Sequence, residues 1–146
     1  MKISMIEVNN LTGFSINKKF LKRVAETVLK GENKKGGLSI ALVGLKRIQK
    51  LNKAYRKKDY PTDVLSFNSP KEFPAVPEAE KELGEVIICP HQVKKNAKKF
   101  NSSFKKELVR VLIHGILHLL GYDHEKSERK AKEMRERENF YLAKIF

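Results

Sequence analysis

Three of the four histidines of this 146-residue chain fall within the eleven-residue segment HGILHLLGYDH at 114–124. His114 and His118 are four residues apart, so on a helix they lie on one face, a turn apart. Gly121 can adopt a positive φ and end that helix, which lets the chain bring His124 toward the other two. Three neutral imidazoles around one point are the protein ligands of a tetrahedral metal site with an open fourth position. The segment therefore predicts one catalytic zinc ion, although another divalent ion also accepts three imidazoles.

The surroundings of these histidines favour a metal site over ordinary buried histidines. Residues 111–120 are apolar apart from His114, Gly115 and His118, so a helix there is buried nearly all round. Two buried imidazoles need polar partners, and one metal ion serves both. By contrast, His91 stands alone after a proline and is expected at the surface, and Cys89 is expected to be a buried apolar residue.

The spacing H-x-x-x-H-x-x-G-x-x-H is similar to that of the metzincin zinc peptidases, including the glycine. Those enzymes carry a glutamate directly after the first histidine, where it acts as general base. Here Gly115 occupies that position and can accept no proton. Peptide hydrolysis by the usual route is therefore disfavoured.

The hydrophobic pattern predicts that a single α+β domain, residues 1–146, positions these side chains. Alternating or compact apolar runs predict strands at 3–8, 38–43, 64–67 and 85–88. Periodicity and capping residues predict five helices, at 15–30, 45–56, 90–100, 103–120 and 126–143. Residues 68–83 are expected to be an exposed loop. The aromatic residues, Phe14, Phe20, Tyr55 and Phe67 among them, are mostly assigned to the core, so no base-stacking residue is assigned.

The charge of the chain points to a polyanionic partner. There are 31 Lys and Arg against 17 Asp and Glu, a formal charge of +14. Residues 1–60 carry 15 basic and 4 acidic side chains, and residues 90–110 carry 7 and 1. Such regional excess favours a basic face that attracts nucleic acid. The absence of an apolar run of about 20 residues argues against a membrane span, and the lack of a signal peptide and of paired cysteines predicts a cytoplasmic protein.

The histidine segment and LNKAYRKKDYPTDVLSF at 51–67 together resemble the YbeY family of metal-dependent endoribonucleases. They match the family patterns N-x-x-Y/F-R-x-x-D-x-P-T-D-V-L-S-F and H-G-x-L-H-L-x-G-Y-D-H. The segment LGEVIICP at 83–90 is similar to the strand between them. The resemblance covers about residues 45–125, with mild departures at Asn68, where proline is frequent, and Glu85, where aspartate is common.

This resemblance implies a mixed sheet packed with about five helices and a metal site on a central helix, in a cleft. It implies zinc on His114, His118 and His124 and a functional role for Arg56. It also implies a single-strand-specific endoribonuclease acting in small-subunit ribosomal RNA maturation and ribosome quality control. The expected partners are RNA, the small ribosomal subunit and its assembly proteins.

In the expected mechanism, the metal and the planar guanidinium of Arg56 stabilise negative charge on the phosphate oxygens during cleavage. Asp123 is a second catalytic candidate, as a base or as the orienting partner of an imidazole, or else it caps the turn after Gly121. Asp63, Ser66 and Tyr122 are possible supporting residues. The attacking group is either water or the 2′-hydroxyl of the substrate.

Two other functions remain open from the sequence. One is an RNA- or ribosome-binding assembly factor whose zinc is structural. The other is a zincin-like hydrolase of a different substrate, against which Gly115 and the basic charge argue.

Overall fold

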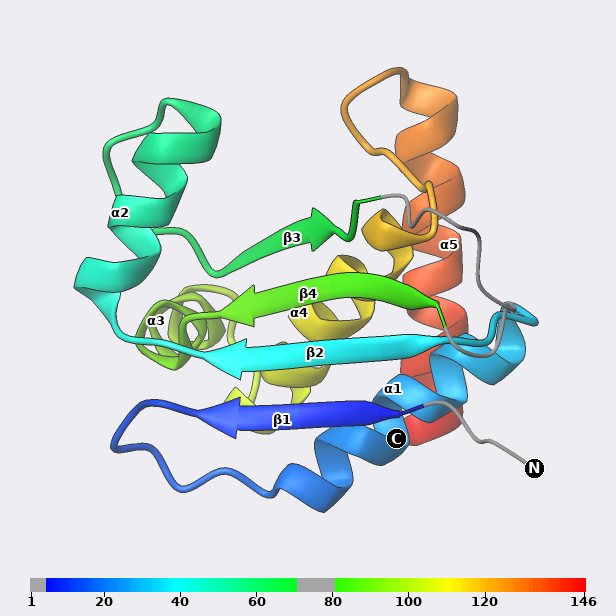
Figure 1. Ribbon diagram of the computed structural model, residues 1–146, viewed down its shortest axis with the longest axis horizontal. Helices are drawn as coiled ribbons and strands as arrows, with labels where there is room; N and C mark the ends of the chain where they lie inside the picture. Colours follow the sequence, from blue (N-terminus) through cyan, green and yellow to red (C-terminus); the bar gives the residue numbers. More distant parts are fainter. Residues whose placement is uncertain (1–4, 71–80) are drawn as a thin grey trace.

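The computed structural model describes residues 5–70 and 81–146. Its elements follow one another in the order β1 (Ile6–Asn10), α1 (Lys18–Gly31), β2 (Gly37–Leu42), α2 (Leu45–Arg56), β3 (Val64–Asn68), β4 (Glu82–Ile88), α3 (Pro90–Lys99), α4 (Phe104–Leu119) and α5 (Glu128–Ile145) (Figure 1). In these two ranges the α+β class and the five helices predicted from the sequence are confirmed.

The four strands form one mixed sheet in the order β1-β2-β4-β3. β1 and β4 both run parallel to β2, so Ile6 pairs with Leu38, and Leu42 pairs with Ile88. β3 runs antiparallel to β4 and places Val64 opposite Ile88. The parallel strands therefore end at the same edge of the sheet, and β3 forms one side of it (Figure 1).

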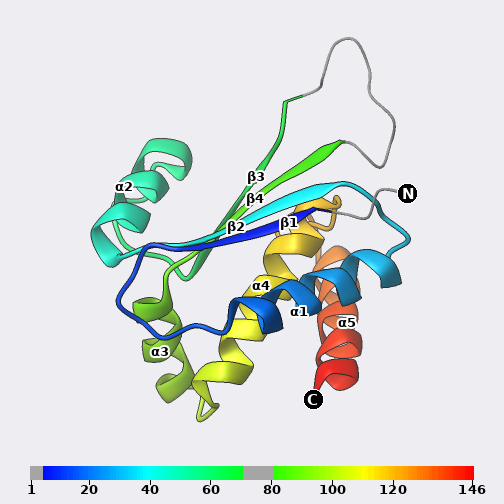
Figure 2. The same cartoon turned by 60° about the horizontal axis from the view of Figure 1, so that its bottom comes forward.

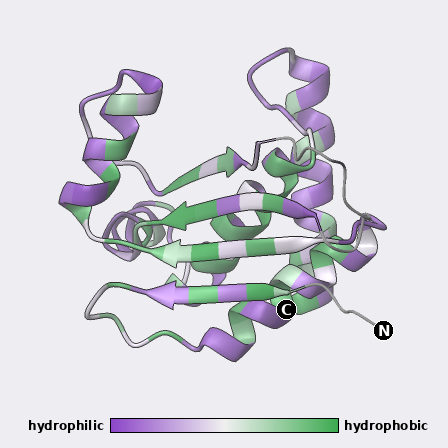
Figure 3. Cartoon of the chain, in the orientation of Figure 1, coloured by the Kyte–Doolittle hydropathy of each residue, from purple (hydrophilic) through white to green (hydrophobic). Residues whose placement is uncertain are grey.

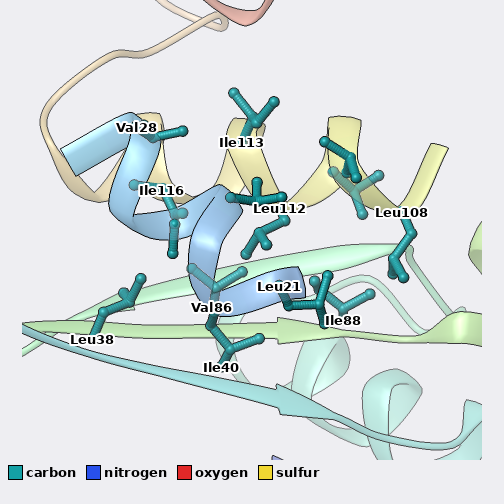
Figure 4. Close-up of a cluster of buried hydrophobic side chains, with 14 of the residues drawn as sticks. Leu21, Val28, Leu38, Ile40, Val86, Ile88, Leu108, Leu112, Ile113 and Ile116 are labelled. Atoms are coloured by element: carbon teal, nitrogen blue, oxygen red, sulfur yellow. The ribbon is translucent and has the colours of Figure 1, made fainter. Parts of the chain in front are cut away.

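Helices α1, α3, α4 and α5 lie on one side of the sheet, with α4 central among them (Figure 2). Figure 4 shows side chains of α1 and α4 meeting those of β2 and β4 in the main core. In α4, ten of the sixteen residues are buried. The sequence prediction of a helix buried nearly all round is confirmed, and this burial fixes the position of everything that α4 carries.

Helix α2 packs differently, at the end of the sheet where β2 finishes (Figure 2). It is mostly hydrophilic (Figure 3), and only Ile48 and Asn52 are buried. Ile48 joins a smaller apolar cluster with Leu65, Ile87 and the buried Cys89. The apolar stripe of α2 extends beyond this cluster, so Tyr55 is 68% exposed. The assignment of Tyr55 to the core was wrong for this reason.

Element boundaries follow the capping chemistry. Helix α1 begins after Asn17, whose side chain accepts a hydrogen bond from the Phe20 amide, rather than at Ser15. Of Ser102 and Ser103, the two candidate caps in the sequence, Ser103 caps α4, by accepting from the Lys106 amide.

Strand β4 begins at Glu82, inside the predicted loop 68–83, of which residues 71–80 lie outside the described ranges. Ile3, in the first predicted strand, also lies outside them. No helix in the described ranges is long and apolar enough to cross a bilayer.

Candidate active site

A cavity of about 610 Å³ lies beside β3. In Figure 1 the end of α2 and the loop between α4 and α5 stand on either side of this strand. The lining residues come from five segments of the chain: Tyr55, Arg56, Thr62–Phe67, Glu107, Arg110, Val111, His114, His118, His124, Glu125 and Glu138. All three predicted metal ligands and the predicted arginine therefore share one cavity.

One face of α4 forms a wall of this cavity. Glu107, Val111, His114 and His118 recur at intervals of four, three and four residues, which keeps them on one side of the helix. The opposite side packs on the sheet. After α4 the chain reverses at Gly121, whose φ of 105° favours glycine, and His124 returns to the cavity. The ring centroids of His114 and His124 are 4.9 Å apart.

The loop that carries His124 is held by a buried polar cluster around Glu32, the residue that follows α1. The hydroxyl of Tyr122 donates to Glu32 at 2.7 Å, and Arg137 of α5 donates to it at 2.6 Å. The hydroxyl of Tyr141 donates to the same carboxylate. Burial opposes ionisation of Glu32, but these hydrogen bonds outweigh it and lower its pKa, whereas burial and Glu32 raise the pKa of Tyr141 to about 12. An ionised Glu32 therefore ties three segments together.

His114 has a carboxylate partner. Its Nδ1 lies 2.8 Å from Oε2 of Glu138, a residue that is only 8% exposed. A carboxylate on one ring nitrogen fixes the ring orientation and leaves the other nitrogen, Nε2, as the donor to a metal, as in many histidine-ligated sites. The pair is thus suited to hold His114 as a ligand.

The donor set fits a divalent ion chemically. Nδ1 of His118 is buried with no hydrogen-bond partner, and His114 has one ring nitrogen committed to Glu138. However, among residues 5–70 and 81–146 no three His, Cys, Asp or Glu side chains are gathered tightly enough to form a metal-holding group. The three histidines share a cavity without a closed coordination shell, so the metal site on α4 stays a prediction.

Arg56 reaches the histidines from the last turn of α2. Its Nη2 lies 3.2 Å from Oε1 of Glu125, and the same oxygen lies 3.9 Å from Nε2 of His124. The Arg56 side chain is 38% exposed. A cation held by an exposed carboxylate at the edge of a cavity remains free to exchange that partner for an anionic ligand.

Asp123, the second catalytic candidate, does not line the cavity. Its Oδ1 accepts a hydrogen bond from the Glu125 amide at 2.8 Å. This hydrogen bond is the main reason that the pKa of Asp123 is lowered. The geometry favours the turn-capping role, and a role for Asp123 in catalysis stays a prediction.

The other candidates divide between the cavity and its surroundings. Asp63 lines the cavity and accepts a hydrogen bond from Asn96 at 3.4 Å. The Ser66 hydroxyl donates to the carbonyl of Gly115 at 2.9 Å, which joins β3 to α4. Tyr122, in contrast, does not line the cavity and donates to Glu32.

Gly115 faces the sheet, not the cavity. A Cβ added there would lie 2.7 Å from Cγ1 of Val86, 3.1 Å from Oγ of Ser66 and 3.2 Å from Cγ2 of Val64. The position at which a zinc peptidase carries its glutamate therefore has no room for a side chain. The helix can approach β3 and β4 closely because a glycine stands here.

The lining residues that sequence reasoning missed include Tyr55, Glu107, Arg110 and Glu138. Glu107 and Arg110 precede His114 by seven and four residues, so helical spacing alone could have placed them on the histidine face. Burial raises the pKa of Glu107, and Arg110, 3.7 Å away, opposes this. Glu138 lies on a separate helix of mixed charge, and no local sequence signal marks it.

Comparison with known proteins agrees with this architecture. The family described as Endoribonuclease YbeY matches residues 6–146. The Endoribonuclease YbeY of Thermotoga neapolitana is 39% identical over 139 residues, which cover 93% of this chain and 87% of that protein. The Endoribonuclease YbeY of Petrotoga mobilis is 40% identical over 147 residues, covering 99% and 96%.

A solved structure is similar over the same length. The solution structure of TM1509 from Thermotoga maritima matches with a TM-score of 0.64 at 37% identity, covering 97% of this chain and 89% of that one. Sequence and fold thus agree over nearly the whole chain. The chain belongs to the YbeY family of endoribonucleases, hydrolases that cut RNA within the strand.

Proposed function

We propose that this endoribonuclease is zinc-dependent and specific for single-stranded RNA, and that it acts in small-subunit ribosomal RNA maturation and ribosome quality control. The proposed setting is the cytoplasm, with the small ribosomal subunit and its assembly proteins as partners. The observation that carries the proposal is the one cavity that collects His114, His118, His124 and Arg56.

In this proposal the three histidines hold the metal. A divalent ion bound there supplies Lewis-acid stabilisation of the negative charge that develops on a phosphodiester during cleavage. Glu138 holds His114 through Nδ1, so that Nε2 is presented to the ion without reorientation. Tyr122, bonded to Glu32, holds the loop from which His124 extends.

Arg56 binds the phosphate. Its planar fork matches two phosphate oxygens, and binding requires it to leave Glu125, a pair exposed enough to exchange at little cost. Arg110, also 38% exposed, is a second cation on the cavity wall and lies 3.7 Å from its partner Glu107. In this proposal both arginines exchange part of their pairing with carboxylates for phosphate oxygens of the substrate.

The proposed nucleophile is either water or the 2′-hydroxyl of the substrate, and an experiment separates the two. Attack by the 2′-hydroxyl leaves a cyclic phosphate end and requires that hydroxyl. A single 2′-deoxy substitution at the cleaved position then abolishes cutting. Cleavage that survives the substitution assigns the attack to water.

The competing function is an RNA-binding assembly factor in which the zinc is structural. The location of the histidines in an accessible cavity, rather than inside the main core, argues against it. Peptide hydrolysis is disfavoured because Gly115 packs against Val86 and leaves no space for the peptidase glutamate.

The deciding experiment combines elemental analysis of the purified protein with cleavage of a single-stranded RNA, with and without chelator. We expect bound zinc, and loss of both zinc and cleavage in His114→Ala. His91→Ala is the matched control, because His91 is exposed and outside the cavity; it retains both.

Two results would contradict the proposal. Cleavage by a folded, metal-free His114→Ala protein would refute a catalytic metal. Loss of cleavage with full rescue of ribosome maturation by the same variant would favour the assembly-factor role.

RNA binding by the basic residues also predicts strong salt dependence. Exposed cations on and directly after α2, the helix that carries Arg56, include Lys50, Lys53 and Lys57. For single strands, the logarithm of the affinity falls with the logarithm of salt by about 0.7 per neutralised phosphate. A nearly flat dependence in a binding titration would argue against an electrostatic RNA track.

A further inference from the structure

Tyr55 is an exposed aromatic residue directly beside the proposed phosphate-binding arginine. Among the large hydrophobic side chains that the structure describes, it has the highest exposure, 68%. It lies in the last turn of α2, beyond Ile48 and Asn52, the buried residues of that helix. Single exposed apolar residues are common and need no explanation by themselves. What distinguishes Tyr55 is where its ring lies.

The ring of Tyr55 forms part of the cavity wall and is supported by a second aromatic ring. Its centroid lies 5.0 Å from that of Phe67, at an interplanar angle of 66°. Both residues line the cavity that holds Arg56 and the histidines, and apart from histidine they are the aromatic residues among its described lining. An edge-to-face contact of this kind holds a ring in place while leaving most of its surface to solvent.

A nucleobase is the ligand that suits this surface. Tyr55 and Arg56 both lie in the last turn of α2 and both line the cavity, so a phosphate on Arg56 brings the base of a neighbouring nucleotide into the cavity that the ring also lines. Bases stack on aromatic side chains whatever their identity, because every base has a π-face. The ring shares the cavity with Arg56 and Arg110, and a nucleotide offers both a base for the ring and a phosphate for an arginine, whereas a purely apolar ligand offers nothing to the arginines.

We infer that Tyr55, supported by Phe67, is a stacking platform for an unpaired base next to the phosphate that the enzyme cuts. The inference rests on the proposed function, because it requires RNA in this cavity. It also gives a physical origin to single-strand specificity. In a duplex both faces of each base are covered by its neighbours, whereas an unpaired base can leave its stack and lie on the tyrosine.

The experiment compares Tyr55→Leu and Tyr55→Phe in binding and cleavage of a short single-stranded RNA. Tyr55→Leu keeps an apolar side chain without a π-face, and we expect it to bind about tenfold or more weakly, the usual effect of losing one stacked base. Tyr55→Phe keeps the ring and is expected to match the wild-type protein. Tyr60→Leu is the control, since Tyr60 is 53% exposed but does not line the cavity; it too should match.

An abasic scan of the RNA then identifies the partner base. At one position next to the cleaved phosphate, removing the base should weaken binding by the wild-type protein but not weaken Tyr55→Leu further, because the two changes remove the same contact. Unfolding curves of the three variants should coincide with that of the wild-type protein, since an exposed ring adds little to stability.

Three results would overturn the platform. They are full affinity in Tyr55→Leu, an equal loss in Tyr60→Leu, and additive effects of Tyr55→Leu with abasic substitution at every position. If the wild-type protein binds and cuts the RNA in the same experiment, these results refute the stacking role of Tyr55 but not the proposed function. A wild-type protein that does not bind single-stranded RNA would overturn both proposals.

Discussion

Replacing Glu138 should weaken metal binding more than it weakens the fold. Oε2 of Glu138 lies 2.8 Å from Nδ1 of His114, and the two side chains are 11% and 27% exposed. Among the side chains that the structure describes, His114 is the only hydrogen-bond partner of Glu138. The carboxylate therefore acts on the site through the orientation and electron donation of one imidazole.

The size of the effect follows from this geometry. Loss of a residue that orients a metal-binding histidine costs about 10- to 100-fold in metal affinity, which is about 1.4 to 2.7 kcal/mol. Glu138→Met removes the acceptor and should show the full loss. Glu138→Gln keeps an oxygen that can accept from Nδ1 and should show a smaller one. In metal-free protein Glu138→Met should lower the free energy of unfolding by no more than about 1 kcal/mol, the usual net contribution of one hydrogen bond, because His114 is 27% exposed and its Nδ1 can bond to water instead.

The assay is titration of metal-free protein with zinc in competition with a chelator, alongside urea unfolding. Glu136→Gln is the matched control, because Glu136 is an exposed acid of the same helix and should bind zinc as the wild-type protein does. Wild-type zinc affinity in Glu138→Met would refute the orienting role. A fall in stability that matches the fall in affinity would reduce Glu138 to a structural residue.

Two further predictions concern the surroundings of the site. Gly115→Ala should lower the free energy of unfolding in urea by about 1 to 3 kcal/mol, because the added Cβ would lie 2.7 Å from Cγ1 of Val86. Gly13→Ala is the control and should not destabilise the protein, because the space around Gly13 is open. Equal effects of the two substitutions would refute the close packing at Gly115. The lowered pKa of Glu32 means that its ionised form stabilises the fold above the usual pKa of 4.5, and that this stabilisation is lost as the pH falls through the folded pKa. Below pH 4.5 the free energy of unfolding of the wild-type protein should therefore fall more steeply than that of Glu32→Gln. Parallel plots of unfolding free energy against pH would show that the cluster does not stabilise the ionised form of Glu32.

The fold was largely predictable because its elements carry local signals. The boundaries of α2, Leu45–Arg56, coincide with the predicted ones, and the Ser103 cap and the Gly121 turn define the ends of α4. Such signals act between residues a few positions apart. The order of the strands is a non-local property, and the sequence pattern left it undetermined.

The site was predictable where its residues share one helix and not where they come from different ones. His114 and His118 are marked by their spacing, and the family pattern added Arg56. Glu138 meets His114 only because α5 packs against α4, which nothing local indicates. Tyr55 was misassigned because helical periodicity shows which face of α2 is apolar, but not how far along that face the sheet extends.

The cluster around Glu32 also joins parts of the chain that are made at very different times. Tyr122 is 90 residues away from Glu32 along the chain, and Tyr141 is 109 residues away. Because a ribosome releases the N-terminal part first, a growing chain that already carries all three histidines still lacks Glu138 and Tyr141. The support that α5 gives to His114 and to Glu32 is therefore added only after the histidine segment has been made.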